Sequence, residues 1–147
     1  MADDGPDTIL LDLFRTNQFR ERLIEAALEG LELPPEDYPF YVLVGAEGPW
    51  TPTALAARMA MPLSTVLFRV KRLEKRGHAE RIPNADDKRS YLVSLTDEGK
   101  QLLGKARPRF RAYAEAVEQQ LGSEQIGRLR GGLTELREAI DAQLNSS

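Results

Sequence analysis

Apolar residues return every three or four positions along most of the chain, which is the spacing of helices, and two short segments alternate instead. Residues 8–31 predict a first helix, which Asp7 or Thr8 can cap and which ends at Gly30. A second helix is expected over about 36–46. The helical spacing resumes after residue 96, so the pattern predicts a mainly helical protein.

Two short helices lie close together in the middle of the chain. Thr51 followed by Pro52 is typical of a helix start, and Pro62 opens another helix that ends at Gly77. Only Ala60-Met61 separates the two helices, and this tight connection predicts a helix-turn-helix.

The alternating segments follow directly. Residues 79–82 and 91–95 have the period of two that is typical of strands, and polar residues 83–89 between them indicate a turn. The sequence therefore predicts a β-hairpin with a charged tip. The expected fold class is mainly α with a small β-hairpin (α+β).

Two long helices are expected at the C-terminal end. Thr96 can cap the first of them, Pro108 should kink it, and Gly122-Ser123 separates it from the second. In the second helix, leucine and isoleucine recur from Ile126 to Leu144 in the manner of a coiled-coil seam. We expect this seam to pack against a second copy of the chain, and folding back within the chain is the alternative.

Length and composition exclude several classes of protein. A chain of 147 residues predicts one domain. No stretch approaches the ~18 uncharged apolar residues that span a bilayer, and the acidic N-terminus does not resemble a signal peptide. We therefore expect a cytoplasmic protein with no membrane partner. The chain has no cysteine and one histidine, His78, so we expect no metal and no cofactor.

Charge is concentrated in the middle of the chain. The net charge is −3, but residues 51–109 contain 13 basic and 6 acidic residues, whereas residues 1–50 contain 3 basic and 11 acidic ones. A concentrated positive segment favours a polyanionic partner, and nucleic acid is the first candidate. A solvated basic face without a partner is the alternative.

The helix expected over residues 63–76 has two unlike faces. One is aliphatic, with Leu63, Val66, Leu67, Val70 and Leu73, and the other carries five cations, two hydroxyls and a phenylalanine. Such a helix can pack by its first face and present the second to the major groove of DNA. The DNA-contacting residues expected on this helix are Ser64, Thr65, Phe68, Arg69, Arg72 and Lys75.

Phe68 allows two interpretations, because a phenylalanine among cations is unfavourable in water. It can contact a thymine methyl group, or it can pack against a neighbouring helix.

The hairpin tip is a second candidate for contact with DNA. Asn84, Lys88 and Arg89 are placed to enter the flanking minor groove, where arginine is favoured. Asp87 fits either turn formation or a charge-assisted hydrogen bond to the Arg89 guanidinium. We include these four residues in the expected DNA site, and a plain solvated loop is the alternative.

Many of these positions match one family pattern. The chain resembles the multiple-antibiotic-resistance regulator (MarR) family in Leu55-Ala56, Val66, Val70, Leu73-Glu74, Gly77, Glu80-Arg81, Asp87-Lys88-Arg89 and Leu95-Thr96-Asp97-Glu98-Gly99. The motif match covers about 55–99, and the terminal helices extend it over nearly the whole chain. Ala60 stands where the family usually has a glycine in the turn.

The resemblance implies a homodimeric winged helix-turn-helix transcription regulator, usually a repressor. Residues 1–34 and 108–147 would be dimerisation helices, residues 35–107 would be the DNA-binding lobe, and Asp87 and Arg89 would form the wing pair. A two-fold dimer would place two reading helices one DNA turn apart, so the double-stranded operator should be pseudo-palindromic.

The resemblance also implies a small aromatic or phenolic effector that relieves repression. Aromatic residues outside the reading helix are natural material for its pocket, and core packing is their other role. The candidates are Phe14, Phe19, Tyr38, Tyr41, Trp50, Phe110 and Tyr113.

Two other classes of function are alternatives. His78 and Glu80 would share one face of a strand, but no nucleophile pattern or glycine-rich phosphate loop accompanies them, so we do not expect an enzyme. A helical adaptor that binds protein and has lost DNA binding is the second alternative, because Leu67 and Phe68 are unusual on a helix that reads DNA.

Overall fold

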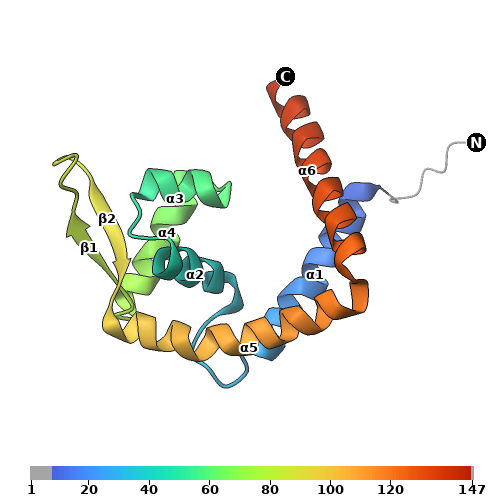
Figure 1. Ribbon diagram of the computed structural model, residues 1–147. Helices are drawn as coiled ribbons and strands as arrows, with labels where there is room; N and C mark the ends of the chain where they lie inside the picture. Colours follow the sequence, from blue (N-terminus) through green and yellow to red (C-terminus); the bar gives the residue numbers. More distant parts are fainter. Residues whose placement is uncertain (1–7, 147) are drawn as a thin grey trace, which may run out of the picture. The chain divides into compact units, whose positions relative to one another are not determined.

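The computed structural model describes residues 8–146, and Figure 1 shows the order of their helices and strands. The chain divides into two compact units, the first ending at Phe110 and the second beginning at Arg111. The elements are α1 (Ile9–Ala27), the 3-10 helix η1 (Pro35–Asp37), α2 (Tyr38–Ala46), α3 (Pro52–Met59), α4 (Leu63–Lys75), β1 (Ala79–Pro83), β2 (Tyr91–Leu95), α5 (Asp97–Leu121) and α6 (Ser123–Asn145).

The expected helix starts are confirmed by hydrogen bonds. The Thr8 hydroxyl accepts from the Leu11 backbone N–H at 3.2 Å, and the Thr51 hydroxyl accepts from the Ala54 N–H at 3.1 Å. Asp7, the other expected cap of α1, lies outside the described residues. The first helix ends earlier than expected, at Ala27, and the second begins as the 3-10 turn η1.

The helix-turn-helix consists of α3 and α4, and its turn has a left-handed residue. Ala60 follows α3 with φ 53° and ψ 44°. This conformation suits glycine, because a Cβ atom there crowds the following carbonyl oxygen. Ala60 therefore has the left-handed backbone conformation that would suit the glycine expected at this position of the turn.

The hairpin formed by β1 and β2 is antiparallel, and Figure 1 shows it extending away from the helices of its unit. Ala79 pairs with Leu95, and Pro83 pairs with Tyr91. At the base of the hairpin, the Thr96 hydroxyl donates to the Gly77 carbonyl oxygen at 2.6 Å and accepts from the Gly99 N–H at 3.1 Å. The expected cap at the start of α5 is thus confirmed, and it also fixes the hairpin to that helix.

The core of the first unit joins α4 to α2, α3, β2 and the N-terminal part of α5. Its residues include Ile24, Leu28, Phe40, Tyr41, Val44, Leu55, Val66, Val70, Leu73, Val93, Leu95 and Leu103. The buried face of α4 is narrower than the aliphatic face in the sequence, because Leu63 is 43% exposed and Leu67 is half-buried.

Helix α6 buries none of its residues. Its seam residues Leu129, Leu133 and Leu144 are 44–69% exposed, and packing of this seam against a second copy of the chain stays a prediction. Helix α5 continues through Pro108, and the bend expected there stays a prediction. Within residues 8–146, no helix combines the length and the apolar character needed to cross a membrane.

Candidate nucleic-acid interface

Helix α4 carries three lengthwise rows, because residues three or four apart lie on the same side of a helix. The buried row is Val66, Val70 and Leu73, each at most 1% exposed. The arginine row is Thr65, Arg69, Arg72 and Arg76, the last lying just beyond the helix end. The outer row is Ser64, Phe68, Lys71 and Lys75, on the side opposite the buried row, and all four are exposed.

Phe68 projects from the outer row and is 61% exposed. The interpretation that it packs against a neighbouring helix is therefore wrong. The guanidinium carbon of Arg72 lies 6.0 Å from the centroid of the Phe68 ring. The outer row thus offers one hydroxyl, one aromatic ring and two ammonium groups to a partner.

The arginine row faces the acidic end of η1. Arg76 contacts the Asp37 carboxylate at 2.8 Å, Arg69 contacts it at 3.2 Å, and Arg72 contacts it at 3.5 Å. The partly exposed Glu36 adds contacts of 3.9 Å with Arg69 and 3.5 Å with Arg72. Two residues expected at DNA, Arg69 and Arg72, are therefore ion-paired within the chain.

Asp37 is fully buried, and a buried carboxylate is stable only when it is paired and hydrogen-bonded. Sequence analysis missed this residue, because nothing next to it in the sequence marks a partner. The one available signal was the spacing of Arg69, Arg72 and Arg76, which places three like charges on one side of a helix and calls for a counter-charge.

The network continues from Arg76 toward β1. The Tyr41 hydroxyl and His78 Nδ1 are hydrogen-bonded at 2.6 Å, and their rings meet edge to face with centroids 5.7 Å apart. Burial raises the pKa of the Tyr41 phenol above its ordinary value of 10, the neighbouring Arg76 opposes this rise, and Asp37 adds to it. His78 and Tyr41 thus fix the end of α4 against α2.

Two turns shape the hairpin tip, and each is closed by a side chain: one by Asn84 and one by Asp87. Asn84 Oδ1 accepts from the Asp86 N–H at 3.1 Å, and Asp87 Oδ1 accepts from the Arg89 N–H at 2.9 Å. Turn formation by Asp87 is therefore confirmed, and the second role considered for it, a bond to the Arg89 guanidinium, is not present among the contacts of residues 8–146. Asn84 is half-buried, whereas Lys88 and Arg89 are exposed.

An arginine holds the hairpin against the helix. Arg81 Nε lies 3.2 Å from the Glu74 carboxylate, and its guanidinium lies 4.4 Å from the centre of the Tyr91 ring. One side chain thus joins α4, β1 and β2. It ties the strands of the hairpin to α4.

The aromatic residues expected to line an effector pocket lie in different surroundings. Tyr38 and Phe110 pack together with ring centroids 4.9 Å apart, and the Trp50 indole donates to the Leu43 carbonyl oxygen at 3.0 Å. Tyr41 lies beside His78, and the exposed aromatic residues are Phe14, Phe19 and Tyr113.

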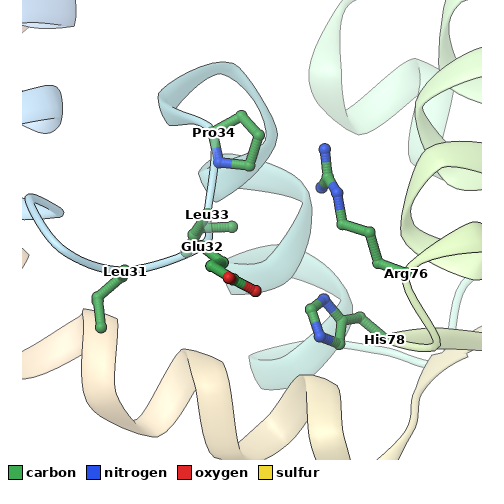
Figure 2. A pocket seen from close by; sticks show the side chains of 6 residues that line it. All are labelled: Leu31, Glu32, Leu33, Pro34, Arg76 and His78. Atoms are coloured by element: carbon green, nitrogen blue, oxygen red, sulfur yellow. The ribbon is translucent and has the colours of Figure 1, made fainter.

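A hollow of about 620 Å³ lies elsewhere, and none of those aromatic residues lines it. Figure 2 shows the side chains of Arg76 and His78 across from the segment that precedes η1. The residues that line the hollow are Leu31, Glu32, Leu33, Pro34, Arg76 and His78. It therefore combines apolar surface with a guanidinium, an imidazole and the carboxylate of Glu32.

No protein-family model matches the chain. The multiple antibiotic resistance protein MarR of Salmonella typhimurium is 30% identical over 87 residues, which are 59% of this chain and 60% of that protein. The chain thus spans less than two thirds of this curated relative.

Solved structures extend the likeness over most of the chain. A probable transcriptional regulator from Pseudomonas aeruginosa is 30% identical, with a TM-score of 0.77 over 88% of this chain and 97% of that one. A mutant of Escherichia coli MarR, solved in complex with operator DNA, has the same fold, with a TM-score of 0.76 at 22% identity over 84% of this chain and 89% of that one.

A helix-turn-helix followed by a two-stranded antiparallel hairpin defines the winged helix-turn-helix class of proteins. Within that class, the chain belongs to the MarR family.

Proposed function

We propose that this protein is a DNA-binding transcriptional regulator that acts as a homodimer, represses its target genes and releases DNA when it binds a small aromatic effector. The observation that carries the proposal is the outer row of α4, which lies opposite the core and is uncovered along its whole length. The operator-bound E. coli MarR mutant, which shares the fold, supports the same assignment. The proposal includes no catalytic role and places the protein in the cytoplasm, where bacterial DNA is found.

The outer row fits the major groove. Ser64 and Phe68 lie in the N-terminal half of α4, where side chains reach base edges, whereas Lys71 and Lys75 lie farther along and suit phosphates. Thr65 is half-buried at the start of the arginine row and lies next to Ser64. This division separates the side chains that read sequence from those that set the position of the helix.

The hairpin tip fits the neighbouring minor groove. Among residues 8–146, neither Lys88 nor Arg89 has an ion-pair partner, so both charges are available to DNA. A narrow minor groove has an enhanced negative potential, which favours arginine. In this proposal Asp87 shapes the turn that presents Arg89, and Asn84 shapes the turn before it.

The uncovered seam of α6 supports the homodimer. Its leucines are too exposed for a helix that acts alone, and a second copy offers the same apolar surface in return. With two copies related by a two-fold axis, the half-sites are expected ~34 Å apart, or ~10 base pairs. The operator should therefore be a pseudo-palindrome.

The hollow beside Arg76 and His78 is the effector site that the contacts support best, in place of the aromatic residues expected from the sequence. Its apolar lining suits the ring of an aromatic effector, and the His78 imidazole beside that lining can hydrogen-bond a polar group on the ring. Binding there would change the surroundings of Arg76, which ends α4. Ligand binding in the hollow would release DNA if the ligand prefers the form of the protein that does not bind DNA.

Fluorescence anisotropy with two DNA duplexes of equal length tests the proposed function. One carries the promoter region of the protein's own operon and the other a scrambled sequence. We expect the promoter duplex to bind at least about 10³-fold more tightly, and its affinity to fall steeply between about 50 and 200 mM salt. Equal, salt-independent binding of the two duplexes would contradict the proposal, and an adaptor that has lost DNA binding would bind neither.

A further inference from the structure

The arginine row has a feature that DNA binding by itself does not require. Three guanidinium groups converge on one carboxylate, and Arg69, Arg72 and Arg76 retain only 22–33% of their side-chain exposure. The lysines of the outer row, on the same helix, are exposed and have no ion pair among the described residues. The cations of this helix thus form two groups: a held group, Arg69, Arg72 and Arg76, and a free group, Lys71 and Lys75.

The held group cannot easily exchange its carboxylate for a phosphate. Asp37 has no exposed surface, so the loss of its partners would leave a bare charge in the protein interior. The Arg69 Nε atom and one terminal nitrogen of Arg76 are themselves buried. These donors are therefore out of reach of a DNA backbone that approaches from outside.

The position of the network explains how it affects the outer row. Asp37 ends η1, and the hydrogen bonds from Arg69 and Arg76 join positions 32 and 39 residues away in the sequence. They meet α4 on the side between its buried row and its outer row. A fixed contact there determines the rotation of α4 about its own axis, and with it the direction in which the outer row points.

We propose that Asp37 is a positioning residue for DNA binding: it withholds Arg69, Arg72 and Arg76 from the DNA and fixes the rotation of α4, so that Lys71 and Lys75 are the cations of this helix that contact phosphates. This inference rests on the proposed function and replaces the expectation that Arg69 and Arg72 bind DNA. It predicts two unlike effects from neighbouring cations on one helix.

The salt dependence of DNA binding distinguishes the two groups. The logarithm of the binding constant falls with the logarithm of salt concentration, with a slope of about −0.9 for each phosphate neutralised. Lys71→Gln and Lys75→Gln each remove one contact per protomer, so each should make the slope shallower by about 1.8 in a dimer. Arg69→Gln and Arg72→Gln should lower the affinity by the same factor at every salt concentration and leave the slope unchanged.

Asp37→Asn tests the carboxylate itself. The amide keeps the shape of the side chain and removes the charge, so the three arginines are released toward solvent. We expect a steeper slope, by up to about 0.9 for each arginine that reaches a phosphate. Circular dichroism establishes that the variant folds, and if it does not, the glutamine variants of Arg69 and Arg72 decide the matter.

The outcomes separate this inference from the proposed function. If the wild-type protein shows no salt-dependent binding to its promoter duplex, the proposed function fails first. If the wild type binds but Arg72→Gln reduces the slope as much as Lys71→Gln does, Asp37 does not withhold that arginine and the inference is overturned. An unchanged slope in a folded Asp37→Asn variant also overturns it.

Discussion

Phe68 is an aromatic side chain exposed on the helix that we propose to enter the major groove. Its side chain is 61% exposed, so its surface is free to meet a base. Thymine is the base that offers an apolar group in that groove, through its C5 methyl. We therefore assign Phe68 to a thymine in each half-site.

Replacement of thymine by uracil in the operator tests that assignment without changing the protein. Uracil keeps the base pairing and lacks the methyl group, so its replacement of thymine in one half-site removes one buried methyl contact and should weaken wild-type binding about 3- to 5-fold. Phe68→Ala should bind the thymine and uracil operators equally. Should the Ala variant still prefer thymine as strongly as the wild type, another side chain makes the contact.

The arginine network shows which single residues the sequence could not reveal. The exposure of Ser64 and Lys75 followed from their place on a helix whose opposite side is aliphatic, whereas the sequence left the surroundings of Phe68 open. The pairing of Asp37 with Arg69 and Arg76 could not be predicted from the sequence. These residues are 32 and 39 positions away from Asp37, and only the tertiary fold brings them together.

At the level of elements, the helix ends and the hairpin were predictable because their signals are local. Thr51-Pro52 starts α3, Gly77 with φ 77° follows α4, and alternation marks both strands. The direction of the Asp87 side chain was not predictable, since a carboxylate two residues before an arginine can reach either its backbone or its guanidinium. The structure shows the backbone contact.

A substitution in the turn between α3 and α4 should make the protein more stable. Ala60 has a left-handed backbone, which costs an alanine ~1–2 kcal/mol, and glycine avoids this cost but loses more entropy on folding. Ala60→Gly should therefore raise the free energy of unfolding, measured in urea, by about 0.5–1 kcal/mol. Ala57→Gly, in the exposed part of α3, is the matched control and should lower it by about 1 kcal/mol. Destabilisation by both changes would show that Ala60 carries no strain.

The wing can be tested through its exposed arginine. Arg89→Ala removes one minor-groove cation per protomer, and we expect operator affinity in an anisotropy assay to fall at least about tenfold, the lower end of a specific contact. Arg128→Ala, which removes an exposed arginine paired with Glu124 on α6, should leave affinity unchanged. Equal binding by wild type and Arg89→Ala would remove the wing from the interface.

At the level of the whole molecule, the exposed seam of α6 calls for a partner. Leu133 is 44% exposed in the single chain, and a dimer would bury it. Leu133→Lys should therefore shift the protein from dimer to monomer in light scattering at micromolar concentration, and operator binding should be lost with it. Thr134→Lys adds a positive charge to an exposed position of α6 on the side away from the seam and should remain a dimer. A monomeric wild type would contradict the homodimer.

The basic middle of the chain predicted a polyanionic partner, but a charge count cannot tell which cations are free. Of the basic residues on α4, the arginines are held by Asp37 and Glu36, and the lysines are free. Composition therefore indicates the class of partner, and the tertiary contacts determine which surface meets it.

A nuclease footprint on the promoter region of the protein's own operon tests the central claim most directly. A dimer that inserts two α4 helices into successive major grooves should protect two half-sites on one face of the duplex, with centres ~10 base pairs apart and related by a pseudo-two-fold axis. The same protection should vanish with the Leu133→Lys variant. A single protected half-site, or uniform protection without any boundary, would contradict the account.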